Sequence, residues 1–447
     1  MKSLRIFSVT SRLAIGCPRR AVLRCIHAIP LVVLIASLSS KAIGDPGAPS
    51  QGAKIVHAAI HNTTLRGQVI LGYQGWFSCP DDRPGADWDH WVGPGGVPAI
   101  DMLPDTSEFP QQPGCRAPFL KDSQGKPVML YSARNPDTVD VQIKWLQQYG
   151  ISGVAVQRFV SALINPASRR DRDVVLTNVQ RSSEHYGRVF FVTYDISGAG
   201  ADWADVVKRD WQALVTSGVT RSSAYLNHDG RPVVEIWGIG FDDRPAKPSE
   251  ALELMLFFSK NADPQLRASI LAGVPVSWRD QTSRNGTNPS WMDVYRLASA
   301  LSPWFIGAVF DAATERKQIE RHIGGDVALA QSTGQVYMPV VFPGFSSANQ
   351  THKPEYFQHP ARGCGKFLEM QTTALLRLGV DSFYVAMFDE LNEGTAVLKP
   401  RVGQVVSSRS TTANFITLDP TCPDEQTLYL RKLGDLSARL GKLSRIH

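Results

Sequence analysis

Three acidic residues stand directly after a short apolar segment near the C-terminus. The segment 383–388 (FYVAMF) is followed by Asp389, Glu390 and Glu393. Because Glu390 and Glu393 are three positions apart, their carboxyl groups can lie on the same side of a turn. Two carboxyl groups held close together raise one pKa, which leaves one ionised base beside one protonated acid near neutral pH. The pair therefore predicts acid–base chemistry of the kind that cleaves an acetal, in which the leaving oxygen must receive a proton.

The same spacing is also typical of an ordinary helix start, where Glu side chains face solvent and interact favourably with the helix dipole. What favours chemistry is the position of the pair after a buried strand. The elements that precede it therefore decide between the two interpretations.

Short apolar segments suited to buried parallel strands alternate with segments of helical periodicity. Strands are predicted at Val69–Gly72, Gly153–Phe159, Val189–Tyr194, Val233–Trp237, Ala268–Val274, Trp304–Asp311, Val336–Val341 and Ser382–Phe388. Helices are predicted at Asp137–Tyr149, Asp171–His185, Asp202–Ser217, Pro248–Ser259, Pro289–Leu301, Thr314–Ser332, Cys364–Leu378 and Asp424–Leu440. Several of these helices begin with Asp or Pro, as helix N-termini commonly do.

This alternation predicts a parallel sheet of the α/β class, and eight strand–helix units fit a closed (β/α)8 TIM barrel. An open, doubly wound sheet is the alternative. Its usual signals are missing, because no G-x-G-x-x-G motif follows the first strand and no G-x-x-x-x-G-K-[ST] motif occurs. We expect a single domain over residues 67–447 with long loops after the strands, such as the Pro- and Gly-rich segment Ser78–Ser132. A loop of that length is usually functional.

In such a barrel the active site lies at the carboxyl ends of the strands. Acidic and aromatic residues dominate these positions here, and a Trp ring suits the apolar face of a sugar, although core packing is the alternative for each single Trp. We predict Glu390 and Glu393 as catalytic. The residues predicted to bind substrate are Tyr73, Gln74, Trp76, His90, Trp91, Gln157, Arg158, Tyr194, Asp195, Trp237, Trp278, Arg279, Asp311, Phe345 and Asn392.

Other chemistries lack their sequence signals. No G-x-S-x-G nucleophile motif occurs, which disfavours an α/β-hydrolase. His57 and His61 are four positions apart, as metal ligands on a helix would be, but no third ligand is evident. Asp87 and His90 fit either a metal ion or the polar groups of a substrate, and we favour the substrate. We therefore predict no metal ion and no cofactor.

Residues 1–44 have the features of a signal peptide. They contain seven basic residues and no acidic one, and the apolar stretch Ala28–Ser39 has twelve residues, fewer than the ~20 of a membrane-spanning helix. The tripeptide Ala42-Ile43-Gly44 resembles a cleavage site, with an uncleaved signal anchor as the alternative. We expect a secreted or periplasmic protein that has no stable membrane insertion after cleavage and an N-terminal extension at 45–66.

The formal net charge of +6 comes from this leader. The rest of the chain has 40 Lys and Arg residues against 41 Asp and Glu residues. Such a balance gives no global attraction to polyanions, so we do not expect nucleic acid as a partner.

Four cysteines lie outside the leader, an even number that predicts disulfides in an oxidising compartment. Three pairings are possible. We favour Cys79 with Cys115 and Cys364 with Cys422, because each pair would crosslink segments near one end of the chain. A zinc site is the alternative, but no C-x2-C spacing supports it.

Four short motifs, in this order, resemble those of glycoside hydrolase family 99 and the neighbouring family 71. They are GYQGWF at 72–77, YSARNP at 131–136, VFPGF at 341–345 and ELNEGT at 390–395. Family 99 contains the endo-α-mannosidases. The resemblance implies that Glu393 is the general acid/base and that Glu390 is the base that deprotonates the substrate 2-hydroxyl. That hydroxyl would attack the anomeric carbon to form a 1,2-anhydro sugar, and configuration would be retained.

The chain departs from the family at Leu391 and Asn392, where family 99 has Trp and His. Three hypotheses follow. The first is a secreted retaining glycosidase that cleaves an α-linked glycan, either mannoside-like or a glucan, so that its partner is an oligo- or polysaccharide substrate. The second is a non-catalytic carbohydrate-binding barrel. The third is a barrel hydrolase that uses a metal ion through His90 and nearby acids.

Overall fold

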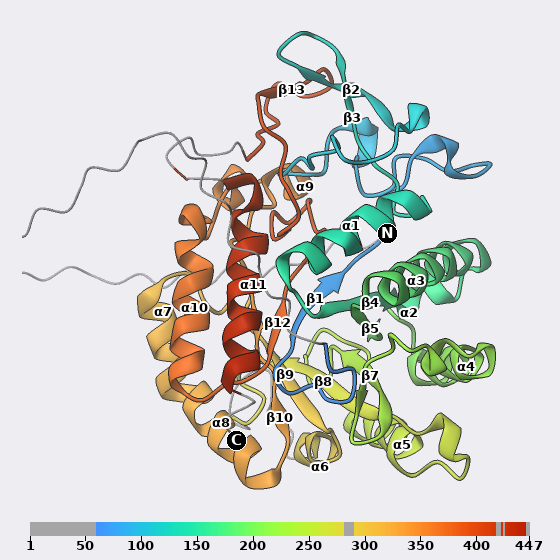
Figure 1. Cartoon of the computed structure of the whole chain (residues 1–447), viewed down its shortest axis with the longest axis vertical. Helices are drawn as coiled ribbons and strands as arrows, with labels where there is room; N and C mark the ends of the chain where they lie inside the picture. Colours follow the sequence, from blue (N-terminus) through green and yellow to red (C-terminus); the bar gives the residue numbers. More distant parts are fainter. Residues whose placement is uncertain (1–59, 281–289, 417–421, 423–424, 444–447) are drawn as a thin grey trace, which may run out of the picture. The chain divides into compact units, whose positions relative to one another are not determined.

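A computed structural model describes residues 60–280, 290–416, 422 and 425–443 (Figure 1). These residues belong to one compact unit. The predicted signal peptide, His57 and most of the predicted N-terminal extension lie outside the described residues. The last part of the extension, residues 60–66, is described, and its Leu65 is fully buried.

Parallel strands form the centre of this unit and close into a barrel. In sheet order they are β1 Val69–Tyr73, β4 Gly153–Phe159, β5 Val189–Asp195, β7 Arg231–Trp237, β8 Ser269–Pro275, β9 Ala300–Trp304, β10 Val336–Tyr337, β11 Val340–Val341 and β12 Phe383–Val385. β10 and β11 are two parts of one segment. The first part pairs with β9 and the second with β12, while β12 pairs with β1. The predicted (β/α)8 barrel is therefore confirmed.

The barrel strands are mostly apolar and almost wholly buried, as is typical of parallel strands that are covered on both faces. Side chains alternate between the barrel interior and the helix layer. Gly72 on β1 shows how tightly the interior is filled, because a Cβ atom at this position would lie 2.7 Å from the hydroxyl of Tyr384 on β12.

The sixth strand differs from the prediction. It is Ala300–Trp304 and not Trp304–Asp311, and the preceding helix is α6 Trp291–Arg296 and not Pro289–Leu301. The Ala- and Leu-rich stretch before Trp304 favours a helix locally, and Pro303 disfavours a strand. Pairing with β8 along the whole length of β9 overrides both preferences.

Helices cover the outside of the barrel (Figure 1). They are α1 Pro136–Tyr149, α2 Val160–Leu163, α3 Pro166–Tyr186, α4 Trp203–Ser217, α5 Pro248–Lys260, α6, α7 Ala312–Gln318, α8 Gly324–Thr333, α9 Ala348–Thr351, α10 Lys366–Arg377 and α11 Glu425–Leu443. A π turn at Ile319–Ile323 joins α7 to α8. Short 3-10 turns, among them Val219–Arg221 and Pro264–Leu266, and a two-residue strand, β6 Asn227–His228, lie in the connections.

Asn-Pro pairs start two of these helices. Asn135 caps α1 by accepting hydrogen bonds from the backbone N–H groups of Asp137 and Thr138, and Asn165 caps α3 in the same way. The helix predicted to begin at Asp171 therefore begins earlier, at Pro166.

The long segment after β1 is not a bare loop. It contains β2 Arg116–Asp122 and β3 Pro127–Met129, which pair antiparallel with each other and, through β2, with β13 Val405–Ser407 from the region after β12. This small sheet lies at one end of the molecule in Figure 1, away from the body of the barrel. It ties the segments that follow the first and last barrel strands together.

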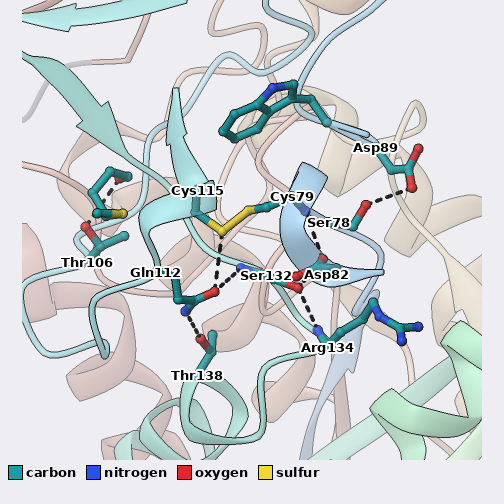
Figure 2. The surroundings of a disulfide bond; sticks show 12 residues. Ser78, Cys79, Asp82, Asp89, Thr106, Gln112, Cys115, Ser132, Arg134 and Thr138 are labelled. Atoms are coloured by element: carbon teal, nitrogen blue, oxygen red, sulfur yellow. Dashed lines mark hydrogen bonds between the residues drawn. A yellow bond between two sulfur atoms is a disulfide. The ribbon is translucent and has the colours of Figure 1, made fainter. Parts of the chain in front are cut away.

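Both predicted disulfides are confirmed. Cys79 pairs with Cys115 and Cys364 with Cys422, with Cα–Cα distances of 5.2 and 5.5 Å. Figure 2 shows the first bond beside Ser132, whose hydroxyl donates to Asp82 at 2.6 Å. None of the described helices combines the length and the hydropathy needed to cross a bilayer.

Candidate active site

The turn after β12 carries Glu390 into a buried position at the carboxyl end of the barrel. Only 6% of Glu390 is exposed. The side-chain amide of Gln74, just after β1, donates to Glu390 Oε1 at 2.8 Å, and the hydroxyl of Thr395 lies 3.0 Å from Oε2. Both carboxylate oxygens are therefore held, one by the first strand and one by the chain beyond Glu393.

Asp389 fixes the turn that carries Gln74. Its carboxylate is fully buried and accepts hydrogen bonds from the backbone N–H groups of Gln74 at 2.7 Å and of Gly75 at 2.8 Å. Gly75 has a φ of +54°, a left-handed conformation that favours glycine. Burial raises the pKa of Asp389 to about 6. Asp389 is thus a positioning residue for Gln74 and, through Gln74, for Glu390.

Glu393 is half-buried and close enough to Glu390 to affect its ionisation. Burial raises the pKa of Glu390 well above its ordinary value, and the neighbouring Glu393 carboxylate raises the pKa of Glu390 further. Burial raises the pKa of Glu393 to about 7. Two coupled carboxyl groups titrate as a pair, so around neutral pH the site can hold one proton and one negative charge.

Asp101 holds the opposite side of the same turn, and sequence reasoning missed it. It is fully buried, and its carboxylate accepts from the hydroxyl of Ser346 at 2.6 Å and from the N–H groups of Ala348 and Asn349, both at 2.8 Å. The N–H of Ser346 donates in turn to the carbonyl of Glu393 at 2.8 Å. Asp101 therefore connects the loop after β11 to the backbone of Glu393.

A polar layer lies inside the barrel. Gln157 on β4 donates to the hydroxyl of Tyr384 on β12 at 3.1 Å, and Thr193 on β5 donates to Glu235 on β7 at 2.7 Å. Burial raises the pKa of Glu235 to about 8. Glu235 was also missed, although a single acid inside an otherwise apolar strand was a signal that could have found it.

An aromatic wall lies next to the turn that carries Glu390 and Glu393, which we call the catalytic turn after the prediction made for these two residues. The ring of Trp76 stacks on His90 at 4.1 Å and on Phe159 at 5.4 Å between ring centroids. These three residues and Arg172 line a cavity of about 510 Å³. Arg172 donates to the carbonyl of Gln74 at 3.1 Å, so the cavity adjoins the turn that holds Glu390. The indole N–H of Trp76 is buried and has no acceptor among the residues that the structure describes.

The comparisons with known proteins agree with this architecture. No protein-family model matches the sequence, and no curated protein matches it. Among solved structures, the GH99 endo-alpha-mannosidase from Bacteroides thetaiotaomicron in complex with bis-tris-propane matches with a TM-score of 0.62 and 14% identity, over 86% of this chain and 100% of that chain. A second structure of that enzyme matches over the same shares at a TM-score of 0.60 and 14% identity. A glycoside hydrolase-like protein matches at 0.52 and 12% identity, over 86% and 98%. The chain has the fold of the family 99 endo-alpha-mannosidase.

The resemblance predicted from the four motifs is thereby confirmed at the level of fold. Three of the motifs also meet around one point. Gln74 of the first motif and Thr395 of the last both bind Glu390, and Ser346, directly after the third, binds the backbone of Glu393. The family 99 fold thus brings together segments that are more than 300 positions apart in the sequence.

Three residues predicted to bind substrate point instead into the helix layer. Tyr73 is fully buried, and its hydroxyl donates to Gln142 on α1 at 2.6 Å. Arg158 makes two hydrogen bonds to Asp210 on α4, and the hydroxyl of Tyr194 donates to the same carboxylate at 2.8 Å. The predictions were wrong because neighbouring residues on a strand face opposite sides. Gln74, Gln157 and Asp195, the next or preceding residues, face the site or the barrel interior.

Four further predicted residues have structural roles. Trp91 is fully buried against Phe77 and Tyr131. Trp278 and Arg279 both donate to Asp326 on α8, at 3.0 and 2.8 Å. Asp311 does not end a strand, because β9 stops at Trp304; it is exposed and caps α7 by accepting from the N–H of Thr314 at 2.8 Å.

The remaining predicted residues lie at the carboxyl ends of the strands. Trp237 ends β7 and contacts Trp304 at 5.0 Å between ring centroids. Asp195 ends β5 and accepts from the N–H of Ser197, and burial raises its pKa. Phe345 is partly buried in the loop after β11. Asn392 is 3% exposed, and within the described part of the chain its side-chain oxygen has no hydrogen-bond donor.

Among the described residues, no group of three or more His, Cys, Asp or Glu side chains has an arrangement that could hold a metal ion. His90 packs against Trp76 and lies within the aromatic wall.

Proposed function

We propose that the protein is a retaining glycosidase that cleaves an α-linked glycan, with Glu393 as general acid/base and Glu390 as the base that assists the substrate 2-hydroxyl. One observation carries this proposal. Two coupled carboxyl groups lie at the carboxyl end of a barrel with the family 99 fold, and Glu390 is fixed there by Gln74 and Thr395. Acid–base cleavage of an acetal requires such a pair.

In the first step, Glu390 accepts the proton of the 2-hydroxyl while O2 forms a bond to the anomeric carbon. The bond between that carbon and the glycosidic oxygen breaks, and Glu393 donates its proton to the departing oxygen. The product is a 1,2-anhydro sugar with inverted configuration. The negative charge moves from Glu390 to Glu393, so the net charge of the pair is unchanged.

In the second step, water attacks the anomeric carbon and the bond to O2 breaks. Glu393 accepts a proton from the water, and Glu390 returns its proton to O2. A second inversion restores the original configuration, and both carboxyl groups recover their starting protonation states. Each step needs one protonated and one ionised group, which is the state that coupled carboxyls with raised pKa values adopt around neutral pH.

The hydrogen bonds around the pair indicate which group starts with the proton. The side-chain nitrogen of Gln74 can only donate, and the bond that it makes favours the ionised form of Glu390. No described side chain donates a hydrogen bond to the carboxyl of Glu393. We therefore assign the shared proton to Glu393 in the resting enzyme.

The proposed substrate is an oligo- or polysaccharide, either mannoside-like or a glucan. The cavity beside the catalytic turn supports it, because its aromatic wall offers flat ring surfaces of the kind that pack against pyranose faces. We also propose that the protein acts outside the cytoplasm, which the sequence of residues 1–44 and the two disulfides support.

A second candidate is a carbohydrate-binding barrel without activity, motivated by Leu391 and Asn392. Leu391 is fully buried, and its carbonyl accepts from the N–H groups of Asp101 and Met102. Its side chain therefore belongs to the core and does not line the cleft. Only Asn392 remains as a departure that a substrate would meet, so the enzyme is the better supported candidate.

The test is a panel of α-mannans, α-glucans and N-glycan fragments, followed by NMR of the first product. We expect release of reducing ends with retained configuration, and loss of turnover in Glu393→Gln with glycan binding preserved. Glu369→Gln, on the exposed face of α10, is the matched control and should be fully active. Glycan binding without turnover in the wild-type protein would favour the binding barrel. Full activity in Glu393→Gln would refute the proposed mechanism.

A further inference from the structure

Three arginines line one cavity on the face of the barrel opposite the carboxyl ends of the strands. Arg221 ends the 3-10 turn after α4, Arg231 begins β7, and Arg267 precedes β8. All three lie where the chain enters a strand, which is the amino-terminal face of the barrel, whereas Glu390 lies beyond the end of β12. The cavity that they share has a volume of about 490 Å³.

Backbone carbonyls hold the three guanidinium groups in place. Arg221 donates to the carbonyl of Val215 at 3.1 Å, Arg231 to that of Ser259 at 3.3 Å, and Arg267 to that of Asn261 at 2.7 Å. Each guanidinium has five N–H donors, so a single such bond orients the group and leaves most of its donors available. The supporting turn is itself fixed, because the indole of Trp211 donates to the carbonyl of Leu266 at 2.9 Å.

These cations lack anionic partners in the part of the chain that the structure describes. None of the three forms an ion pair there, and no Asp or Glu lines the cavity. The nearest acid in sequence, Asp263, accepts from the N–H of Gln265 as the cap of a 3-10 turn. Three like charges around one cavity repel each other, and a bound anion would relieve that repulsion.

We propose that this cavity, which we call the arginine pocket, binds a ligand through a phosphate or sulfate group. Planar guanidinium groups present paired donors that match the oxygen atoms of such groups. The hydroxyl of Thr220 and the amide of Gln265 add neutral polar groups to the same wall. A volume of about 490 Å³ exceeds what a single phosphate fills, so the cavity has room for a further polar body, such as a sugar ring, attached to the anion.

The arginine pocket does not depend on the proposed function. It lies at the other end of the barrel from Glu390 and Glu393, and it contributes no residue to that site. It would hold an anionic ligand, or a substituted glycan, without blocking the cleft at the carboxyl ends of the strands. An inactive barrel with the same pocket would bind the anion equally well.

The test is calorimetric titration of the full-length mature protein, at constant low ionic strength, with inorganic phosphate, mannose 6-phosphate and mannose. We expect both phosphates to bind and mannose not to bind. Arg231→Gln combined with Arg267→Gln should weaken phosphate binding at least about tenfold, because charged hydrogen bonds are lost from two of the three groups. Tighter binding of mannose 6-phosphate than of inorganic phosphate would identify the sugar-linked anion as the ligand class. Equal affinities would identify the free oxyanion.

Two controls keep the test decisive. Arg296→Gln removes an exposed arginine of α6 and should leave phosphate binding unchanged. Arg221→Gln alters the exposed member of the pocket, so it should reduce affinity without affecting folding, which unfolding curves would verify. Phosphate binding that is absent in the wild-type protein, or unchanged in both pocket variants, would overturn the proposal. Either result would leave the proposed glycosidase activity untouched.

Discussion

The side-chain amide of Gln74 donates a hydrogen bond to Glu390 at 2.8 Å, across the seam at which the first and last barrel strands meet. The two residues are 316 positions apart in the sequence. Asp389, next to Glu390, binds the backbone of Gln74 in return. The catalytic turn and the turn after β1 are therefore a single hydrogen-bonded unit, so that closure of the barrel also assembles the site.

Gln74→Leu should move the pH dependence of activity. The bond from Gln74 lowers the pKa of Glu390, which burial and Glu393 raise. Without it the pKa rises, and Glu390 is ionised only at higher pH. The acid limb of the kcat/KM profile should therefore shift upward by about one pH unit. Thr395→Val should shift it in the same direction.

Gln180→Leu is the control for this prediction, because Gln180 is exposed on α3 and bonds only Glu184 among the described residues. Its profile should match that of the wild type. A Gln74→Leu enzyme that loses rate equally at every pH would show that Gln74 positions Glu390 without tuning its ionisation.

Glu235→Gln should flatten the pH dependence of stability. Burial raises the pKa of Glu235 to about 8, so the folded protein keeps this proton after the unfolded chain has lost it near the ordinary value of 4.5. The wild type should therefore lose stability as pH rises between these two values, by on the order of 1.4 kcal/mol for each pKa unit of difference. Gln cannot ionise, so the variant should lose the contribution of Glu235 to this slope, while the other buried acids with raised pKa values keep theirs. Urea unfolding at pH 5 and pH 8 measures it, and an equal slope in both proteins would contradict the prediction.

The sequence was most informative where one strong local pattern acts alone. The segment 189–194 (VFFVTY) consists entirely of β-branched and aromatic residues, and the segment 153–156 (GVAV) is apolar throughout, so both fit a buried strand. Glu390 and Glu393 were predicted as catalytic because acids that directly follow an apolar strand are unusual. The Asn-Pro pair that starts α3 was a further local signal, and it was not used.

The sequence was less informative where long-range contacts decide. Asp101 lies in a loop, and no local feature of it predicts the three hydrogen bonds that it accepts from residues about 245 positions away. Arg158 and Tyr194 look like site residues by position, but the side that each faces depends on strand alternation and on Asp210 of α4. The sixth strand was misplaced because pairing with β8, which the sequence of β9 does not show, outweighs its own propensity.

Asp101→Ala should lower both stability and turnover. The substitution leaves the N–H groups of Ala348 and Asn349 buried without acceptors, which costs about 1–3 kcal/mol for each group. It also frees the loop that binds the backbone of Glu393 through Ser346. Urea unfolding and kcat on the best substrate measure the two effects. Asp293→Ala, at an exposed position on α6, should change neither. Lowered stability with unchanged kcat would show that the loop does not position Glu393.

Removing the Cys79–Cys115 bond should weaken glycan binding as well as stability. The bond closes a loop of 36 residues, and its loss should destabilise the protein by about 3–4 kcal/mol. Cys79 lies beside Ser78, which bonds Asp89 at 2.7 Å and so connects the disulfide to the neighbour of His90 (Figure 2). Loosening this segment should disturb the stack of Trp76 and His90.

The double variant Cys79→Ser/Cys115→Ser should therefore raise KM more than it lowers kcat, since Glu390 and Glu393 are held by other bonds. Cys364→Ser/Cys422→Ser is the matched control, because it opens a loop of 58 residues with a similar loss of stability but no contact with the aromatic wall. Kinetics well below the unfolding temperature of each variant separates the two effects. If both variants change KM equally, the aromatic wall does not depend on the first disulfide, and the cavity beside the catalytic turn is rigid without it.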